Sequence, residues 1–428
     1  MLSISKTANP NYVCKIVKLD NVRKHENADK LQVATIDFQN VIIGLDEKEG
    51  DVCVFFPVES QINANFIKFI NAFRENTHNA DETKKGFFEN NCRVKAVKLR
   101  GEKSIGFVVP ISQVESFVGQ KIEEEVGTEF DYINDIKLVN KYEIFKPGMT
   151  TRNGRIEKRI SRLVEGQFHF HVDTENLRKN AANIKPEDYI SVSYKVHGTS
   201  AIFSRVLVKR KLNLIEKFSK LIGVKVQETE YDLLYSSRKV VKNEFETKDK
   251  CGFYSTDIWG DVKNEIADKI PEGYTIYGEI IGFTKDNKQI QAGYDYGCEP
   301  GQHKFQVYRI TITNNSGQVI NLSTAQIREF CERVGLETVH YFYEGFAKDM
   351  YPEIQGIENW STAFVRKLEE YHTDKDCYMC KNVVPEEGVV VRKDLTFSFE
   401  GYKLKSFRFL ELESKELDKG EADMESSN

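Results

Sequence analysis

Apolar and polar residues alternate over short runs in the first third of the chain. These runs are rich in β-branched or aromatic side chains, and turn-forming sequences separate them. The runs cover residues 12–16, 31–36, 41–43, 52–56 and 92–97. Alternation with a period of two is typical of a β-strand with one buried face. Several short strands at this spacing predict a small all-β barrel between about residues 11 and 136.

The rest of the chain mixes strand-like and helical patterns. Strand-like runs recur between residues 191 and 405, beginning with residues 191–194 and 201–203. Residues 214–222 and 359–371 instead repeat apolar residues at the spacing of a helix with one apolar face. We expect both helices to bury that face against the protein.

Length and composition agree with two domains. A chain of 428 residues exceeds what one hydrophobic core usually supports, and 40% hydrophobic with 30% charged residues is ordinary for a soluble globular protein. The net charge of −5 neither indicates nor excludes a nucleic-acid partner. Lysines and arginines outnumber acids over residues 141–165, which predicts a basic linker that either faces a phosphate backbone or is a solvated connector. The acidic end of the chain, from Glu411, is expected to be a helix end that frays into a disordered tail over residues 413–428.

No signal peptide or membrane-spanning run is visible, and eight scattered cysteines do not form a disulfide framework, so we expect an intracellular protein.

Cys377 and Cys380 form an isolated C-x-x-C pair with only His372 nearby. A closed zinc site needs a further ligand, which favours two reduced cysteines.

The most informative short sequence is Lys195-Val196-His197-Gly198-Thr199. Lysine becomes a nucleophile when burial or a neighbouring cation lowers its pKa, and the strand-like runs on both sides indicate burial. Gly198 would let the backbone reverse and approach a ligand closely. Taken alone, this sequence is equally compatible with an exposed hairpin.

Five further clusters follow this lysine in a fixed order. They are Ser237-Arg238, Glu279 within residues 277–282, the aromatic residues Phe305 and Tyr308, Glu387 before residues 388–392, and Lys403 with Lys405. As an ordered set, the six clusters resemble the nucleotidyl motifs I, Ia, III, IIIa, IV and V of the covalent nucleotidyltransferases, which include polynucleotide ligases and mRNA capping enzymes. The resemblance covers about residues 195–406.

Details of the resemblance favour the RNA ligase 2-like branch. His197 stands where DNA ligases and capping enzymes usually have aspartate. Those enzymes also need an OB domain after motif V, whereas 23 residues follow Lys405. Residues 25–31 and 98–101 are similar to those of RNA ligases with an N-terminal OB domain. Such a barrel would bind nucleic acid or its phosphates, and the alternative is that it only stabilises the core.

The resemblance implies a fold and domain boundaries. We expect an α+β protein in which an N-terminal OB-type β-barrel precedes an ATP-grasp-like nucleotidyltransferase domain of antiparallel sheets with flanking helices. The OB domain would span residues 1–140, the linker 141–165, the adenylation domain 166–412 and the tail 413–428.

The resemblance also implies a reaction. An ATP-dependent RNA ligase would join RNA 3′-OH and 5′-phosphate ends, at nicks or in duplex RNA, through a lysyl-adenylate on Lys195 and an RNA-adenylate. Lys403 and Lys405 would stabilise charge on the α-phosphate of ATP. Glu387 would hold Mg²⁺, with Mn²⁺ as a substitute.

Other residues would bind the nucleotide. His197 and Gly198 belong to the nucleotide-binding set through motif I. By resemblance, Glu279 would hold the ribose hydroxyls, and Arg238 would bind ribose or the RNA 5′-phosphate.

Three motif positions differ from the residues that the family usually has there. An aromatic residue of motif IIIa would stack on adenine, and Tyr308 is favoured over Phe305 because it takes the place usually held by phenylalanine. Arg309 follows it where the family commonly has aspartate. Ser200 stands where the RNA ligase 2-like motif often has asparagine, a residue suited to handling the RNA 5′-phosphate.

Other interpretations stay open from the sequence. The chain could be a GTP-using capping guanylyltransferase, a DNA ligase, or a non-catalytic RNA-binding protein with a degenerate core. Glu279 and Glu387 could be only ion-pair partners of Lys403 and Lys405. Residues 171–177 resemble a segment that precedes motif I in OB-fused ligases, but they could instead begin a helix.

Overall fold

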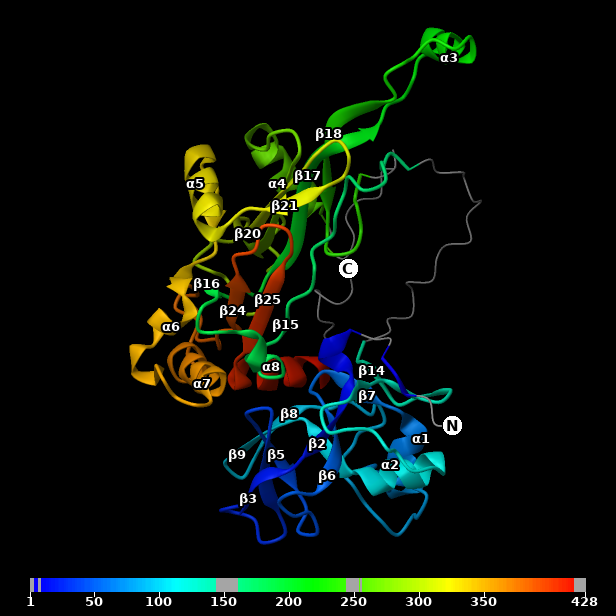
Figure 1. Cartoon of the computed structure of the whole chain (residues 1–428), viewed down its shortest axis with the longest axis vertical. Coiled ribbons are helices and arrows are strands. Elements are labelled where there is room, and N and C mark those ends of the chain that lie inside the picture. The colour runs from blue at the N-terminus through cyan, green and yellow to red at the C-terminus, as the bar shows by residue number, and fades with distance from the viewer. Residues whose placement is uncertain (1–3, 7–8, 144–160, 244–253, 255, 419–428) are drawn as a thin grey trace.

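The computed structural model describes residues 4–6, 9–143, 161–243, 254 and 256–418, and places them in two parts (Figure 1). The smaller part is all-β with two short helices and lies at the bottom of the view, below the larger mixed part. Most of the predicted basic linker and the end of the predicted tail fall outside the described residues.

The smaller part consists of short antiparallel strands around an apolar core. Its strands are β1 (Ile4–Ser5), β2 (Cys14–Lys18), β3 (Asp20–Lys24), β4 (Gln32–Ile36), β5 (Gln39–Ile43), β6 (Val52–Phe56), β7 (Ser60–Ile62), β8 (Ala96–Leu99), β9 (Glu102–Ile105), β10 (Phe107–Pro110), β11 (Glu129–Phe130), β12 (Tyr132–Ile133), β13 (Ile136–Lys137) and β14 (Val139–Lys141), and its helices are α1 (Ala64–Phe69) and α2 (Ile111–Val118). The main sheet has the order β10-β6-β2-β11, and β3-β4-β5 form a second sheet. Phe56, Phe66 and Phe130 are fully buried in the core.

Most of the predicted strand runs coincide with strands of this part. Runs 12–16, 31–36, 41–43 and 52–56 overlap β2, β4, β5 and β6. The run at 92–97 is an exception, because only its end belongs to a strand, β8. Cys92 has a φ of +53°, a left-handed backbone conformation that interrupts a strand.

The larger part contains two sheets in which antiparallel pairing predominates. Its strands are β15 (Glu175–Asn176), β16 (Tyr189–Tyr194), β17 (Thr199–Lys209), β18 (Thr229–Ser236), β19 (Tyr274–Gly282), β20 (His303–Thr313), β21 (Val319–Asn321), β22 (Glu337–Thr338), β23 (Tyr341–Phe346), β24 (Gly388–Lys393) and β25 (Glu400–Lys405). Its helices are α3 (Leu214–Leu221), α4 (Ile258–Ile266), α5 (Thr324–Val334), α6 (Ala347–Met350), α7 (Trp360–His372) and α8 (Phe407–Asp418). One sheet has the order β18-β17-β19-β20-β21 with β22 beside β20, and the other has the order β15-β25-β24-β16-β23.

Helices cover one face of each sheet. Trp259 of α4 and Ile327 of α5 are fully buried against the β17–β20 sheet. Phe364 and Leu368 of α7 are fully buried against the β16–β24–β25 sheet, so the helix predicted at residues 359–371 packs as expected. None of the helices in the described part of the chain combines the length and the apolar character needed to span a bilayer.

The chain crosses from one sheet to the other between Tyr194 and Thr199. β16 ends at Tyr194 and β17 begins at Thr199, and these strands pair with different neighbours. The hairpin interpretation of this segment is therefore wrong. Gly198 is required by close backbone approach, because a Cβ there would lie 2.5 Å from the carbonyl oxygen of Ile280.

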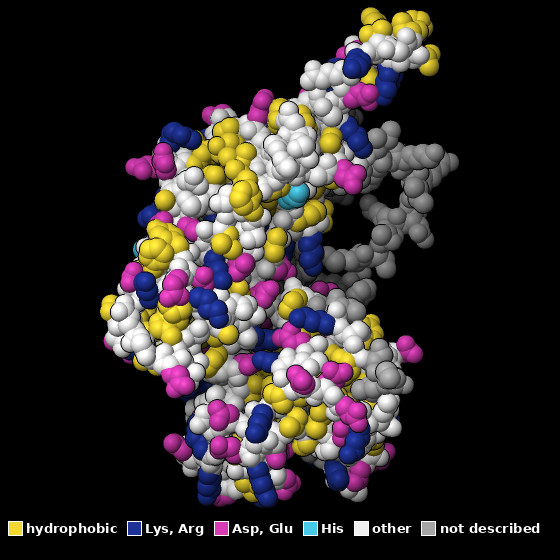
Figure 2. Space-filling view, in the orientation of Figure 1, with side chains coloured by type: hydrophobic (Ala, Val, Ile, Leu, Met, Phe, Trp, Pro, Cys, Tyr) yellow, Lys and Arg dark blue, Asp and Glu magenta, His cyan; other side chains and the backbone are white. Residues whose placement is uncertain are grey.

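Helix α3 forms where the sequence predicts it but does not bury its apolar face. Strands β17 and β18 extend beyond the sheet as a projection from the larger part, and α3 lies at the tip of this projection (Figure 1). Leu214 and Leu221 are 83% and 82% exposed, and hydrophobic side chains gather at this tip in Figure 2. The expectation of packing was wrong because helical periodicity reports an apolar face and not what lies opposite it.

Helix α8 connects the two parts and corrects the predicted tail boundary. It continues through Asp418, and Glu413 and Ser414 are buried. Arg93 of the smaller part donates a hydrogen bond from Nη2 to the carbonyl oxygen of Ser414 (2.7 Å), and Lys95 Nζ lies 2.8 Å from Asp418 Oδ2. Asp418, one of the acidic residues that suggested disorder, thus pairs with basic residues of the barrel.

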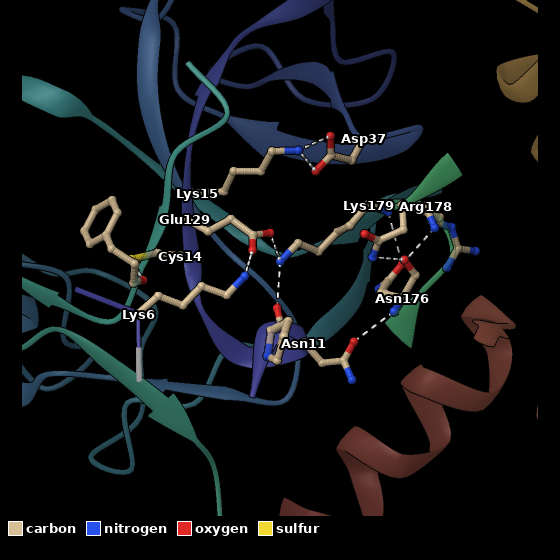
Figure 3. Close-up of polar contacts among 12 residues, drawn as sticks. Lys6, Asn11, Cys14, Lys15, Asp37, Glu129, Asn176, Arg178 and Lys179 are labelled. Carbon is tan, nitrogen blue, oxygen red and sulfur yellow. Dashed lines mark hydrogen bonds and ion pairs between the residues drawn. The ribbon is translucent and has the colours of Figure 1, made fainter. Parts of the chain in front are cut away.

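A second set of polar contacts joins the two parts near β15 (Figure 3). The Asn11 side chain accepts a hydrogen bond from the backbone N–H of Asn176 (2.8 Å) and donates to the carbonyl oxygen of Thr174 (3.1 Å). Lys179 lies 2.6 Å from Glu129. Burial alone would raise the pKa of Glu129. The charge of Lys179 and the hydrogen bonds that Glu129 accepts from Lys179 and Lys6 outweigh burial and lower that pKa.

The contrast between α7 and α3 is testable by alanine substitution. Phe364→Ala should lower the free energy of unfolding by about 3–5 kcal/mol, because it opens a cavity in the core. Phe218→Ala, on the 63% exposed side chain of α3, should change it by less than about 0.5 kcal/mol. Thermal or denaturant unfolding measures both, and equal losses would contradict the assigned burial.

Candidate active site

A cavity lies between the two sheets of the larger part. It is lined by His171, Asp173, Thr174, Ser191, Ser193, Tyr194, Lys195, Val196, Ser200, Arg238, Glu279, Tyr308, Val339, Tyr341, Val390, Arg392, Phe399, Lys403 and Lys405. Six of the predicted site residues are among these: Lys195, Arg238, Glu279, Tyr308, Lys403 and Lys405. The other four, His197, Gly198, Phe305 and Glu387, are not part of the lining.

Lys195 lies where the chain crosses between the sheets. Its backbone N–H donates to the carbonyl oxygen of Gly388 (2.9 Å), which ties the crossing to the start of β24. Its Nζ is 2.6 Å from Oε1 of Glu387, and the two side chains are 14% and 1% exposed. Glu387 therefore contacts the ammonium group of Lys195 but does not itself line the cavity.

His197 and Gly198 hold the crossing segment in place. The His197 ring packs edge-on against Tyr294 and Phe409, with ring centroids 5.1 and 4.9 Å apart, and its Nδ1 is 3.9 Å from Glu387. The backbone N–H of His197 donates to the hydroxyl of Tyr296 (2.6 Å). Neither His197 nor Gly198 lines the cavity, so their positions do not support direct contact with a nucleotide.

Gly198 is held in the same way. Its carbonyl oxygen accepts a hydrogen bond from Nε2 of Gln291 (2.7 Å). Gln291 and Tyr296 belong to the connection between β19 and β20, and no local motif in the sequence marks them as partners of the lysine segment.

Lys403 and Lys405 occupy alternate positions of β25 and both line the cavity. Lys405 Nζ lies 2.9 Å from Glu59 and 3.3 Å from Glu413. Burial alone would lower the pKa of Lys405, but the carboxylates of Glu413 and Glu59 outweigh it and raise the pKa well above its ordinary value. The lysine is therefore cationic.

Arg238 and Asp173 form an ion pair at the cavity, with Nη2 and Oδ1 2.6 Å apart. Asn9 of the smaller part also donates to Asp173 (3.0 Å). Burial alone would raise the pKa of Asp173, but the charges of Arg238 and Lys403 lower it. The helix interpretation of residues 171–177 is wrong, because the segment instead leads into β15.

Glu279 and Ser200 lie opposite each other on neighbouring strands. They are paired residues of β19 and β17, 8% and 5% exposed, and both line the cavity. The carbonyl oxygen of Ser200 accepts a hydrogen bond from Nε1 of Trp259 (3.0 Å). Hydrogen bonding to α4 therefore fixes this edge of the cavity.

An aromatic wall forms another side. The ring of His171 lies 5.1 Å from that of Tyr308 and 5.3 Å from that of Phe399, measured between centroids. Tyr308 lies where the register of β19 and β20 shifts, and such a bulge redirects a side chain. Phe399 was missed by the sequence analysis because it lies in the connection from β24 to β25, outside every motif.

Phe305 lies on the other face of β20 from the cavity. It packs against Phe203, with centroids 5.1 Å apart, in the core under α4 and α5. Alternation along a strand places side chains three residues apart on opposite faces. The expectation that Phe305 binds the nucleotide is therefore not supported by its position.

Two buried arginines lie beside the aromatic wall. The guanidinium of Arg309 is 4.4 Å from the ring centroid of Phe399 and 4.8 Å from that of Tyr277, and its Nε donates to Asn321 (2.9 Å). Arg392 lines the cavity itself. Burial lowers the pKa of both arginines. Arg309 stands where the family commonly has aspartate. This position thus carries a buried cation between aromatic rings in place of an acid.

The protein-family comparison decides the identity. A model described as RNA ligase matches residues 188–407, more than half of the chain and the whole span from β16 to β25. The chain belongs to the RNA ligase family. It is thus a member of a family of ATP-dependent ligases. An OB-fold domain model matches residues 13–111 of this RNA ligase, so the N-terminal barrel is an OB fold and the predicted fold class is confirmed.

Solved structures of similar fold include RNA ligase variants from Naegleria gruberi. A variant with AMP and manganese is 14% identical over 93% of this RNA ligase and 98% of that chain, with a TM-score of 0.58. A variant with ATP and manganese is 15% identical over 94% and 98% of the two chains, with a TM-score of 0.57. No curated protein matches the chain. At this identity the likeness shows a shared two-domain fold.

Substitution can separate the two aromatic residues of motif IIIa. Tyr308→Ala should weaken ATP binding by about tenfold, since stacking on a base contributes about 1–3 kcal/mol. Phe305→Leu should leave ATP binding unchanged and lower only the melting temperature. Titration with ATP measures the affinity, and the reverse pattern would show that Phe305 is the stacking residue.

Proposed function

We propose that this RNA ligase joins RNA 3′-OH and 5′-phosphate ends at nicks in duplex RNA, through a lysyl-adenylate on Lys195 and an RNA-adenylate. One observation carries the proposal. The amine of Lys195 lies at a cavity between two sheets, beside Glu387, and the same cavity is lined by Lys403 and Lys405. A buried amine and two cations around one cavity are the groups that nucleotidyl transfer requires.

The reaction follows from these groups. The Lys195 amine attacks the α-phosphorus of ATP, a P–N bond forms, and the bond to pyrophosphate breaks. Lys403 and Lys405 offset the negative charge that develops on the α-phosphate. The AMP then passes to the RNA 5′-phosphate, which frees Lys195. Attack by the 3′-OH on that phosphate finally forms the phosphodiester and releases AMP.

The cavity walls supply the nucleotide contacts. Tyr308, with His171 and Phe399, provides rings against which adenine stacks. The carboxylate of Glu279 accepts hydrogen bonds from the ribose hydroxyls. Arg238 lies at the cavity with Asp173 and binds ribose or the RNA 5′-phosphate.

A divalent cation, magnesium or manganese, would be held on the protein side by Glu387, which contacts Lys195 and lies just outside the cavity lining. Among the described residues, no group of three or more histidine, cysteine, aspartate or glutamate side chains is placed to hold a metal. Mg²⁺ is usually held by one or two carboxylates together with water and substrate phosphates, so Glu387 suffices on the protein side. Bound there, a divalent cation would compete with Lys195 for the carboxylate and favour the neutral, nucleophilic amine.

The OB domain, proposed to span residues 1–140, would bind the RNA. OB folds bind single strands or phosphates through loops and basic groups, and the basic residues of the linker at 141–165 would add phosphate contacts. The adenylation domain would begin at about residue 166 and, with α8, continue to Asp418.

Lys195→Ala should abolish transfer of labelled AMP from ATP to the protein, because Lys195 carries the one amine of the segment and His197, its other nitrogen nucleophile, does not line the cavity. The same variant should still seal a nick that already carries a 5′-adenylate, since that step does not use the lysine. Sealing is therefore the control for folding. Labelling at the parental rate would place the nucleophile elsewhere.

Lys403→Ala should slow single-turnover adenylation by about 10² or more, the effect of removing one electrostatic stabiliser of a transition state. An unchanged rate of adenylation in this variant would show that Lys403 does not contact the reacting phosphate.

ATP should label the protein and GTP should not, which separates RNA ligase from capping chemistry.

A further inference from the structure

A carboxylate of the OB domain reaches a lysine of the proposed adenylation site. Glu59 lies between β6 and β7, and its Oε1 is 2.9 Å from Lys405 Nζ. Their side chains are 21% and 11% exposed. The two residues are 346 positions apart in the sequence, so the contact exists only when the OB domain is docked on the adenylation domain.

The backbone holds Glu59 in the conformation needed for this contact. Its φ is +66°, in the left-handed region that residues other than glycine rarely adopt. Its N–H donates to the carbonyl oxygen of Val94 (3.2 Å), and its own carbonyl oxygen accepts from the N–H of Tyr142 (2.9 Å). Strained conformations of this kind persist where surrounding bonds enforce them, and they are frequent at functional sites.

Lys405 is held by two acids from different elements. Besides Glu59, both carboxylate oxygens of Glu413 in α8 lie 3.3 Å from its Nζ. Three carboxylate oxygens thus surround Nζ, which matches the three N–H donors of an ammonium group, and a bound phosphate would replace one of the two longer bonds to Glu413. Because Lys405 also lines the cavity, a phosphate bound there is placed to take over that donor from Glu413.

Both members of the contact are charged. Burial alone would raise the pKa of Glu59, but Lys405 and Lys403 lower it to about 2. The acid is therefore ionised throughout the pH range in which a ligase is assayed. Removing it would leave a buried ammonium group with one acid instead of two.

We propose that Glu59 is a positioning residue for the adenylation step: it orients the ammonium group of Lys405 so that a donor released by Glu413 meets a phosphate of ATP. This inference rests on the proposed function of Lys405. It makes the docked OB domain a component of the adenylation site, in addition to any role in RNA binding.

The test measures lysyl-adenylate formation in single turnovers of the full chain over a range of ATP concentrations. Glu59→Ala should lower the maximal rate constant by about tenfold or more, the effect of losing a hydrogen bond between charged groups. The ATP concentration for half-maximal rate should change by less than about threefold, because an interaction used mainly in the transition state affects the rate constant more than binding. Glu59→Gln keeps an oxygen acceptor and should restore part of the rate.

Two further variants control for domain docking. Lys95→Met removes an ion pair between the same two domains without touching Lys405, and it should leave the rate constant within about threefold of the parent. Glu59→Ala in a Lys405→Met background should add no further loss, since the effect acts through Lys405. Melting temperatures confirm that each variant is folded.

The possible failures are distinguishable. If Glu59→Ala adenylates at the parental rate while Lys405→Met is slow, the positioning inference is wrong and the proposed function stands. A loss in Lys95→Met equal to that in Glu59→Ala would overturn it as well, because docking alone would then account for the effect. If Lys195→Ala and Lys405→Met both adenylate at the parental rate, the proposed function itself fails.

Discussion

The passage of the chain between two sheets at Lys195–Gly198 is the constraint on which the rest of the site depends. Gly198 allows the two backbones to approach closely at Ile280, where any side chain would collide. The close approach and the hydrogen bond from Lys195 to Gly388 fix where one sheet meets the other. The cavity therefore forms where the chain crosses between the sheets, and this crossing places Lys195 in the wall of the cavity.

Charge at the domain interface connects this cavity to the OB fold. Lys405 bonds Glu59 on one side, and Asp173 accepts a hydrogen bond from Asn9 on the other. Breaking one partner of a buried ion pair costs about 3–5 kcal/mol, so the docked arrangement depends on the pair of Glu59 and Lys405 staying intact. Lys405 and Asp173 both line the cavity at which the chemistry is proposed.

Local pattern carries much of this structure. Lys195, Glu279 and Lys403, which line one cavity, could be grouped from the sequence because their clusters resemble, as an ordered set, the motifs of the covalent nucleotidyltransferases. Glu59 and Phe399 could not, because their roles depend on contacts made far along the chain. The errors have similar causes: Phe305 shares a motif with Tyr308 but alternates to the opposite face, and α3 has an apolar face that the projecting strands carry away from the core.

The most direct test of this account is to locate the AMP. The protein is incubated with ATP and Mg²⁺ in the absence of RNA, digested under conditions that preserve a phosphoramide, and the modified peptide is sequenced by mass spectrometry. We predict a single AMP adduct, on the side chain of Lys195. An adduct on another lysine, or none while RNA ends are still joined, would contradict the central claim that the crossing between the sheets presents the nucleophile.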